Sequence, residues 1–541
     1  MKNIRIKRLS RKGRLLLSAG IVLAVLLGAW FGVQAWLGHE VTRLLESEPI
    51  NLDGSAYTTD IKSVRVDLAR RSITLRGVSL KNQKGTRTRK DGPIPLLEAR
   101  AARVSASGIH FRKGKGDKPG ILRIRTIRID TPDITFEGVP GTACDTCGTP
   151  NAALRKMRLS VERFAVTGAT IRAGVWQEGE KHTFAATGLD ATLRDIALGD
   201  TLSGGKTPKA ALSALSLSAG QLAYTLKNGA LKVEADSLAV DSEAGTFAAA
   251  RLALLPQYDK YQYALRVGDH TDWLALDVRE VAGTGLRLPF PGNDQLLHAD
   301  SVRVGSVAIA SYKDRNQPQS PAVRPMLYTS VQRIPAGFDI PFIDVRHIDI
   351  RYEEVSQGAT LPGVITFTDM AARITGLTNR PARESQQYRI DAEGYLLGGA
   401  RVRSTLALPA DSRNDFFALA AEVGPMSATI ASPVTEPIAN IRIVSGSIHS
   451  VTVALSGNSR EAQATVEMPY DDLQIAILHK NDPDRQRKLL TTIANDMVLH
   501  RSNPEGDRLR IGHGRHERDP YKSFWNYLWK TSFVGVADIV M

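Results

Sequence analysis

The sequence predicts a mostly β protein, in which an N-terminal transmembrane helix precedes an elongated, curled antiparallel sheet that forms a groove. Short amphipathic helices are expected at the C-terminus. Three observations support this fold class: segments of alternating apolar and polar residues recur throughout, turn residues separate them, and a long uncharged apolar run follows a basic N-terminus. The 541 residues are 43% apolar and 23% charged, which is typical of folded protein.

The N-terminus is expected to anchor the chain in a membrane. Residues 1–14 contain seven Lys or Arg and no acid, which is half of the formal net charge of +14, and residues 15–37 carry no charge. About 20 apolar residues suffice to span a bilayer, and the basic flank should stay cytoplasmic. We therefore expect a cytoplasmic segment (1–14) and a single-pass signal anchor (15–37). A cleaved signal peptide is the alternative, because Val33-Gln34-Ala35 resembles a cleavage site.

The alternating segments predict strands with one apolar and one polar face. The stretch SVRVDLARRSITLRGVSL (63–80) places apolar residues two apart on both sides of a polar turn, and FIDVRHIDIRYEEV (342–355) repeats the pattern. Side chains two positions apart on a strand share a face. The residues expected to line this apolar face are Val64, Val66, Leu68, Ile73, Leu75, Ile343, Val345, Ile348 and Ile350.

Composition suggests where the β region divides. Residues 313–341 contain five prolines and little alternation, and proline lacks the backbone donor that a sheet interior needs. This segment is interpreted as a linker between a first β-groove half (38–312) and a second (342–480). Residues 481–541 form a C-terminal helical and aromatic tail.

The tail carries two helical patterns, over 483–498 and 519–541. In the second pattern, aromatic and leucine residues are expected to share one broad sector. Such a helix either lies in a membrane interface or caps an open end of the sheet. The membrane-interface candidates are Phe524, Trp525, Leu528 and Trp529.

Three loops raise separate possibilities. Cys144 and Cys147, the only cysteines, are a disulfide candidate within a surface loop, with a reduced pair or a redox or metal site as alternatives. The basic runs 81–90 and 111–120 are either solvated loops or contacts for anionic headgroups near the anchor.

Catalytic signatures are missing from the sequence. It contains no G-x-S-x-G, H-E-x-x-H, P-loop or Rossmann pattern. A metal could bind at HGRHERD (513–519), although surface polarity explains that cluster equally well. Asp471 and Asp472 are adjacent and would face opposite sides of a strand. The basic loops lack interleaved aromatic residues, which argues against nucleic-acid binding. We expect neither an enzyme nor a cofactor.

The apolar faces require a cover, because an exposed apolar sheet would aggregate. A second sheet, closure into a barrel, or a trough filled by a mobile apolar ligand would each provide one. Aromatic residues are only 6% of the chain, and small or medium apolar residues dominate the strands. This composition favours the trough, where acyl chains would contribute roughly 0.8 kcal/mol per buried methylene.

Several motifs resemble a known family. They are the pattern at Val64–Leu80, the tyrosine-ending segments SVAIASYKD (306–314) and RHIDIRYEE (346–354), ITGLTN (374–379), AEGYLLGG (392–399), residues 424–448, MPYDDLQIAIL (468–478) and the closing DPYKSFWNYLWKTSFVGVADIV. Together they are similar to the AsmA-like proteins of Gram-negative bacteria, especially the Bacteroidetes-type members related to TamB. The similarity extends over nearly the whole chain after residue 40 and includes no catalytic residue.

The resemblance implies an inner-membrane anchor, a periplasmic β-groove, and binding or transfer of phospholipid for outer-membrane homeostasis. The expected partners are the inner membrane, phospholipid acyl chains and an outer-membrane or periplasmic protein. A non-catalytic structural or assembly factor for outer-membrane proteins is the alternative function.

Overall fold

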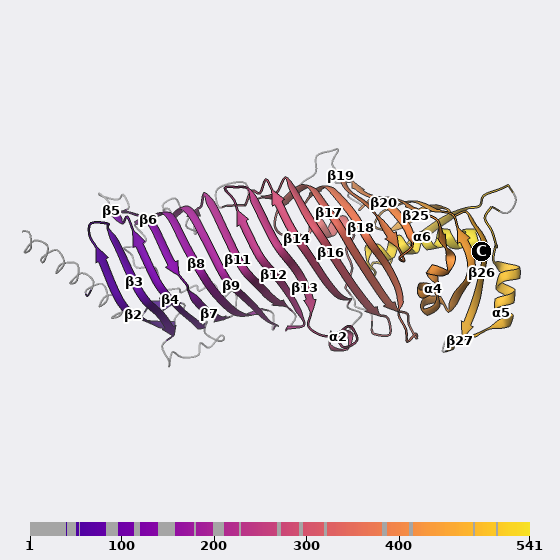
Figure 1. The fold of residues 1–541 in the computed structure, drawn as a ribbon, viewed down its shortest axis with the longest axis horizontal. Helices are drawn as coiled ribbons and strands as arrows, with labels where there is room; N and C mark the ends of the chain where they lie inside the picture. The colour runs from indigo at the N-terminus through magenta and orange to yellow at the C-terminus, as the bar shows by residue number, and fades with distance from the viewer. Residues whose placement is uncertain are drawn as a thin grey trace, which may run out of the picture. The chain divides into compact units, whose positions relative to one another are not determined.

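The computed structural model describes residues 39, 50–52, 55–82, 96–112, 120–138, 157–177, 180–198, 210–226, 229–267, 272–290, 296–318, 322–380, 387–409, 415–479, 482–504 and 507–541. Strands dominate these residues and helices are few, as the sequence predicts (Figure 1). No helix within these ranges is both long and apolar enough to cross a membrane. The predicted anchor (15–37), Cys144 and Cys147, and most of the two basic loops lie outside the described residues.

The chain divides into two compact units. The first contains Met1–Gly179 and Thr183–Leu217, and the second contains Glu180–His182 and Ser218–Met541. The proline-rich segment 313–341 lies inside the second unit. The main boundary between the two units lies between Leu217 and Ser218.

From residue 50 on, the elements that the structure describes in the first unit are strands. They are β1 (Ile50–Leu52), β2 (Ser55–Asp67), β3 (Ser72–Asn82), β4 (Leu96–Ser107), β5 (His110–Arg112), β6 (Gly120–Asp130), β7 (Asp133–Gly138), β8 (Met157–Gln177), β9 (Glu180–Leu198, mostly in this unit) and β10 (Ala210–Ala211).

Strands β1 to β4 pair antiparallel in chain order. Strand β4 then pairs with both β6 and β7, which follow each other along the chain, and these two pair in parallel with β8. Between β6 and β7, Thr131 adopts a φ of 46° and marks an irregularity in an otherwise continuous line of strand.

The second unit begins within β11 (Ala214–Leu226). Its further strands are β12 (Leu231–Asp241), β13 (Thr246–Pro256), β14 (Trp273–Thr284), β15 (Leu297–His298), β16 (Ser301–Asp314), β17 (Phe338–Val355), β18 (Gly363–Thr378), β19 (Gln387–Leu396), β20 (Ala400–Pro409), β21 (Phe417–Val423), β22 (Met426–Ser427), β23 (Ile441–Ile448), β24 (Val451–Gly457), β25 (Glu461–Glu467), β26 (Tyr470–His479), β27 (Asp482–Gln486) and β28 (Ile511–Glu517).

Helices in the second unit are short, apart from the last one. They are α2 (Lys260–Val267), α3 (Leu327–Gln332), the 3-10 helix η3 (Ala428–Ala431), α4 (Ser432–Ala439), α5 (Lys488–Ile493), the π-helix η4 (Ala494–Val498) and α6 (Phe524–Val540).

The pairings in the second unit run β12, β13, β14, β16, β17, β18, β19, β20, β21, β24, β25 and β28. All are antiparallel except the parallel pair β16–β17. The proline-rich segment with α3 connects this parallel pair, which explains why a long connection was needed there. Strands β22, β23, β26 and β27 belong to a second, smaller sheet.

Irregular positions follow one another across neighbouring strands of the second unit. The register of each of three neighbouring strand pairs omits one residue pair. The omitted pairs are Ala250 with Glu280 (β13–β14), Glu280 with Gly305 (β14–β16) and Gly305 with Arg346 (β16–β17). Glu280 has a φ of 55°, in the left-handed region that non-glycine residues rarely adopt. We call this line of skipped pairs the seam.

Candidate functional site

In the first unit, apolar side chains form rows that cross the strands. Val64 lies opposite Leu75, which lies opposite Val104, and the row continues through Ile129 to Val166. A second row, two residues along, contains Val66, Ile73, Ala106, Ile127 and Phe164. Most of these side chains are half-buried, not fully enclosed. The predicted one-sided face is therefore a continuous apolar surface over β2, β3, β4, β6 and β8.

The polar residues between these rows alternate onto the opposite face of the first unit. There Asp130 accepts hydrogen bonds from Arg128 (2.6 Å), Arg103 (2.5 Å) and the Thr167 hydroxyl (3.0 Å), which come from three different strands. The Arg128 hydrogen bond, with help from Arg103 and Thr167, outweighs burial and lowers the pKa of Asp130 to about 2. Hydrogen bonds to the Asp130 carboxylate therefore connect three neighbouring strands on the polar face, while the other face is apolar.

The second unit repeats the arrangement with larger side chains. Leu276 on β14 lies opposite Ile309, which lies opposite Ile350 on β17 and then Phe367 on β18. These four residues are half-buried, and Leu274, two positions before Leu276, is 38% exposed. Apolar side chains at this level of exposure form a surface that a ligand could cover.

The seam allows the apolar pattern to change phase without leaving its face. Ile343 and Val345 are two residues apart, whereas Val345 and Ile348 are three apart, yet all three belong to one apolar cluster. On the neighbouring strand, Val304 and Val307 show the same spacing of three. The omitted pair, Gly305 with Arg346, lies within both three-residue spacings. Each strand has one additional residue there, so the apolar alternation continues on the same face beyond the seam.

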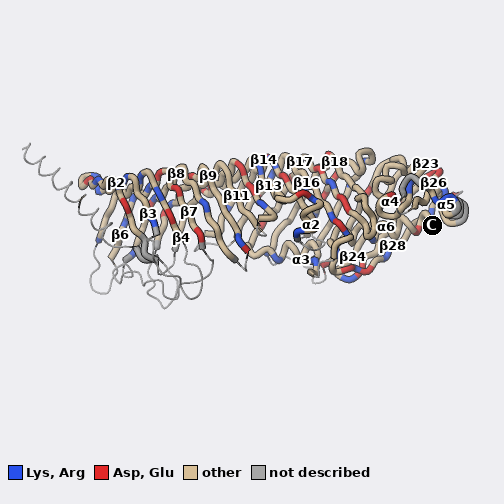
Figure 2. The backbone as a smooth tube through the Cα atoms, turned by 90° about the horizontal axis from the view of Figure 1, so that it is seen from below, with Lys and Arg blue, Asp and Glu red and all other residues tan. Residues whose placement is uncertain are grey.

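The opposite face of the second unit is again charged. The Asp277 carboxylate accepts hydrogen bonds from Arg251 (2.6 Å) on β13 and from Arg279 (2.7 Å) on its own strand. Burial alone would raise the pKa of Asp277, but the two guanidinium groups outweigh it and hold the pKa below its usual range. Figure 2 shows acidic and basic positions interspersed along these strands.

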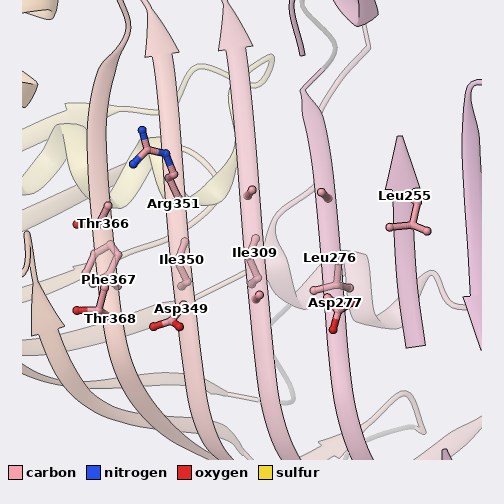
Figure 3. Close-up of a pocket in the computed structure, with 13 residues that line it drawn as sticks. Leu255, Leu276, Asp277, Ile309, Asp349, Ile350, Arg351, Thr366, Phe367 and Thr368 are labelled. Atoms are coloured by element: carbon pink, nitrogen blue, oxygen red, sulfur yellow. The ribbon is translucent and has the colours of Figure 1, made fainter. Parts of the chain in front are cut away.

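An open hollow of about 440 Å³ lies over β13, β14 and β16–β18 (Figure 3). Its lining includes Ala308, Ala310, Asp349 and Arg351, which alternate with Ile309 and Ile350 along the strands. The four members of the apolar row, Leu276, Ile309, Ile350 and Phe367, also line the hollow.

The last strands of the second unit are covered by α6. The row that contains Ile343 continues through registered neighbours to the strands under this helix; its members are Ile374, Ile390, Leu406, Leu419, Leu455, Ala464 and Gly514. Helix α6 contacts β24, β25 and β28 and buries Phe524 and Leu528 in a core with Leu455. At this end the apolar face has a protein cover.

The structure separates the four membrane-interface candidates. Phe524 and Leu528 are 4% and 7% exposed and pack inside the protein. Trp525 and Trp529 are 61% and 49% exposed on the other side of α6. The four candidates therefore do not share one sector: α6 carries apolar side chains on both sides, and Phe533 (51% exposed) is exposed together with the two tryptophans.

Most of the groove candidates lie in strands. Val64 and Val66 lie in registered rows with Leu75 and Ile73, but Leu68 lies in the turn after β2, not in the strand. The candidates on β17 also lie in strand: Ile343, Val345 and Ile348 belong to one cluster, and Ile350 belongs to the row of Phe367.

The chemical candidates do not assemble into a site. His513 and His516 are three apart on β28, where strand alternation directs them to opposite faces, and the His516 ring packs near Tyr527. Asp471 pairs with His449 (2.7 Å). In the described part of the chain, no group of three or more His, Cys, Asp or Glu is arranged to hold a metal ion.

Comparison with known proteins adds no identification. No protein-family model matches this chain, and no curated protein matches it.

Proposed function

We propose that this protein binds phospholipid by laying acyl chains on the apolar faces of its strands, as an inner-membrane-anchored periplasmic protein that serves outer-membrane homeostasis. One observation carries the proposal: in each unit, registered rows of half-buried apolar side chains lie opposite a charged face. A surface of this kind is rarely left uncovered in a soluble environment.

The energetics support an acyl ligand. Each methylene removed from water contributes roughly 0.8 kcal/mol, so a chain of a dozen methylenes that covers one row gains several kcal/mol even when it is only half-enclosed. Side chains such as Val64, Ile309 and Ile350 provide an apolar contact surface that does not match one particular ligand shape. This suits a flexible ligand more than a rigid one.

The sequence resemblance to AsmA-like proteins supports the localisation. That family combines a signal anchor with a periplasmic β-groove, and residues 1–37 have the composition of such an anchor.

Native mass spectrometry of the full-length protein extracted in mild detergent tests the proposal. We expect copurified phospholipid that remains bound after extensive washing. Protein that carries only detergent after extraction from several membrane preparations would contradict it.

A structural or assembly role remains the second candidate, and the C-terminal core favours it. Beneath α6 the apolar face is filled by the protein's own side chains, including Val466 and Ile539, which are both 0% exposed. If the protein's own side chains covered the whole apolar face in this way, no lipid would be recovered.

A further inference from the structure

Arginines from neighbouring strands follow one another across the polar face of the first unit. On β3 and β4, Arg76 lies directly opposite Arg103. On β2, Arg65 lies opposite Thr74, which is two residues before Arg76 on β3. Side chains two positions apart on a strand share a face, so these three arginines lie on the same side of the sheet.

The line of arginines continues over β6 and β8. Arg128 lies two residues before Asp130, which is opposite Arg103. Arg163 on β8 lies opposite Thr126, two residues before Arg128 on β6. Neighbouring strands are about 4.8 Å apart, so the five arginines extend over roughly 19 Å. We call Arg65, Arg76, Arg103, Arg128 and Arg163 the arginine row.

The guanidinium groups of the arginine row outnumber the carboxylates around them. All five side chains are exposed. Arg103 and Arg128 share one carboxylate, that of Asp130. The other three members make no ion pair with any residue that the structure describes. These three cations are therefore open to an external anion.

One contact within the arginine row is unfavourable for the protein itself. Like charges directly opposite each other on antiparallel strands destabilise a sheet, and Arg76 and Arg103 are such a pair. A carboxylate at position 76 would instead pair with Arg103. An anion that binds between the two guanidinium groups removes the repulsion that folding leaves in place.

The side chains beside the arginine row indicate the kind of anion. The registered neighbours of its members are mostly hydroxyl residues: Ser63, Thr74, Ser105 and Thr126. None of the four offers an aromatic ring on which a nucleic-acid base could stack, or a large apolar group that could enter a bilayer. Arginine forms bidentate hydrogen bonds with carboxylates, and alternate side chains of an extended polypeptide repeat about every 7 Å on one face. An acidic polypeptide therefore fits this surface better than a nucleic acid or a membrane.

We propose that the arginine row binds an acidic, extended segment of a partner protein, which lies across β2, β3, β4, β6 and β8 on the polar face. The carboxylates of that segment pair with the exposed guanidinium groups, and the neighbouring hydroxyl groups bind its polar backbone. This surface lies on the face opposite the apolar rows, so the inference goes beyond lipid binding and does not depend on it.

The test uses full-length protein in detergent and a fluorescein-labelled peptide in which Glu and Ser alternate. Fluorescence anisotropy at low ionic strength measures binding, because salt screens contacts between exposed charges. We expect Arg65→Gln/Arg76→Gln to bind the peptide about tenfold more weakly than wild type, which corresponds to about 1.4 kcal/mol. Arg303→Gln/Arg346→Gln is the matched control, since it removes two exposed arginines of the second unit and should bind as wild type does.

Arg76→Glu provides a second variant that separates binding from stability. It should bind the peptide still more weakly, yet unfold no earlier than wild type, because the new carboxylate lies opposite Arg103. Unchanged peptide binding in this variant would overturn the proposal.

The remaining outcomes are equally decisive. No binding of the peptide by the wild type, or equal weakening in the two double variants, overturns the proposal, because net charge alone would explain the second result. Tighter binding of single-stranded oligothymidylate through the same arginines would show a nucleic-acid surface and overturn the polypeptide assignment. None of these results changes the test of lipid binding by mass spectrometry.

Discussion

Gly512 on β28 lies directly against Gly535 of α6: a Cβ atom placed on Gly512 would overlap the carbonyl oxygen of Gly535. A neighbouring pair repeats the contact, because a Cβ on Gly514 would overlap the Thr531 carbonyl oxygen. The absence of side chains at these strand positions lets the helix backbone pack onto the sheet, so the cover at this end of the apolar face depends on them.

Gly512→Ala should therefore destabilise the second unit. Overpacking at a contact between backbones typically costs about 1–3 kcal/mol. Urea unfolding followed by tryptophan fluorescence measures the change, since Trp525 and Trp529 lie on α6. Gly399→Ala is the matched control, because no atom lies within 4 Å of the added Cβ, and it should stay within about 0.5 kcal/mol of wild type. Equal midpoints for the two variants would show that α6 tolerates displacement.

The two sides of α6 should respond differently to truncation. Phe524→Ala removes a buried ring that packs edge-to-face on Phe417 (5.0 Å between centroids), and we expect a loss of about 3–5 kcal/mol. Trp525→Ala, one residue away and 61% exposed, should cost far less. Thermal unfolding of both variants checks this, and a comparable loss in Trp525→Ala would mean that the exposed side has a partner within the protein.

Asp130 should make the stability of the first unit depend on acid pH. Its pKa is lowered to about 2, below the unfolded value of about 4, so its contribution is present above pH 4 and is lost as pH falls toward 2. Asp130→Asn should be less stable than wild type at neutral pH, and the difference should disappear near pH 2. Unfolding midpoints measured from pH 6 to pH 2 check this.

Arg65→Gln is the control for that experiment, since it removes an exposed charge without changing a carboxylate. Its difference from wild type should not change with pH over the same range. A constant difference for Asp130→Asn as well would contradict the assigned hydrogen bonds from Arg103 and Arg128.

The sequence predicted the elements better than their connections. Alternation located β2, β3 and β17 closely, because period-two spacing reflects a one-sided face directly. The change of phase between Val345 and Ile348 could also be read from spacing, but its cause is the seam, which arises from register with neighbouring strands. Register depends on residues far apart in the chain, so no local pattern reveals it.

The linker shows the same limit. Prolines in 313–341 indicated an irregular connection, yet they could not show that the strands on either side pair in parallel within one unit. The glycines of β28 were a signal that the sequence interpretation missed: alternate glycines in a strand indicate a close backbone approach.

The placement of a photo-crosslinker at adjacent positions of one strand tests the central claim most directly. Ile309 lies on the apolar row, whereas its neighbour Ala308 is exposed on the opposite face. In the first unit, Val64 and exposed Arg65 form an equivalent pair. We predict phospholipid adducts in cells at Ile309 and Val64 and background levels at Ala308 and Arg65. Equal capture at both members of each pair would contradict acyl-chain binding on the apolar face.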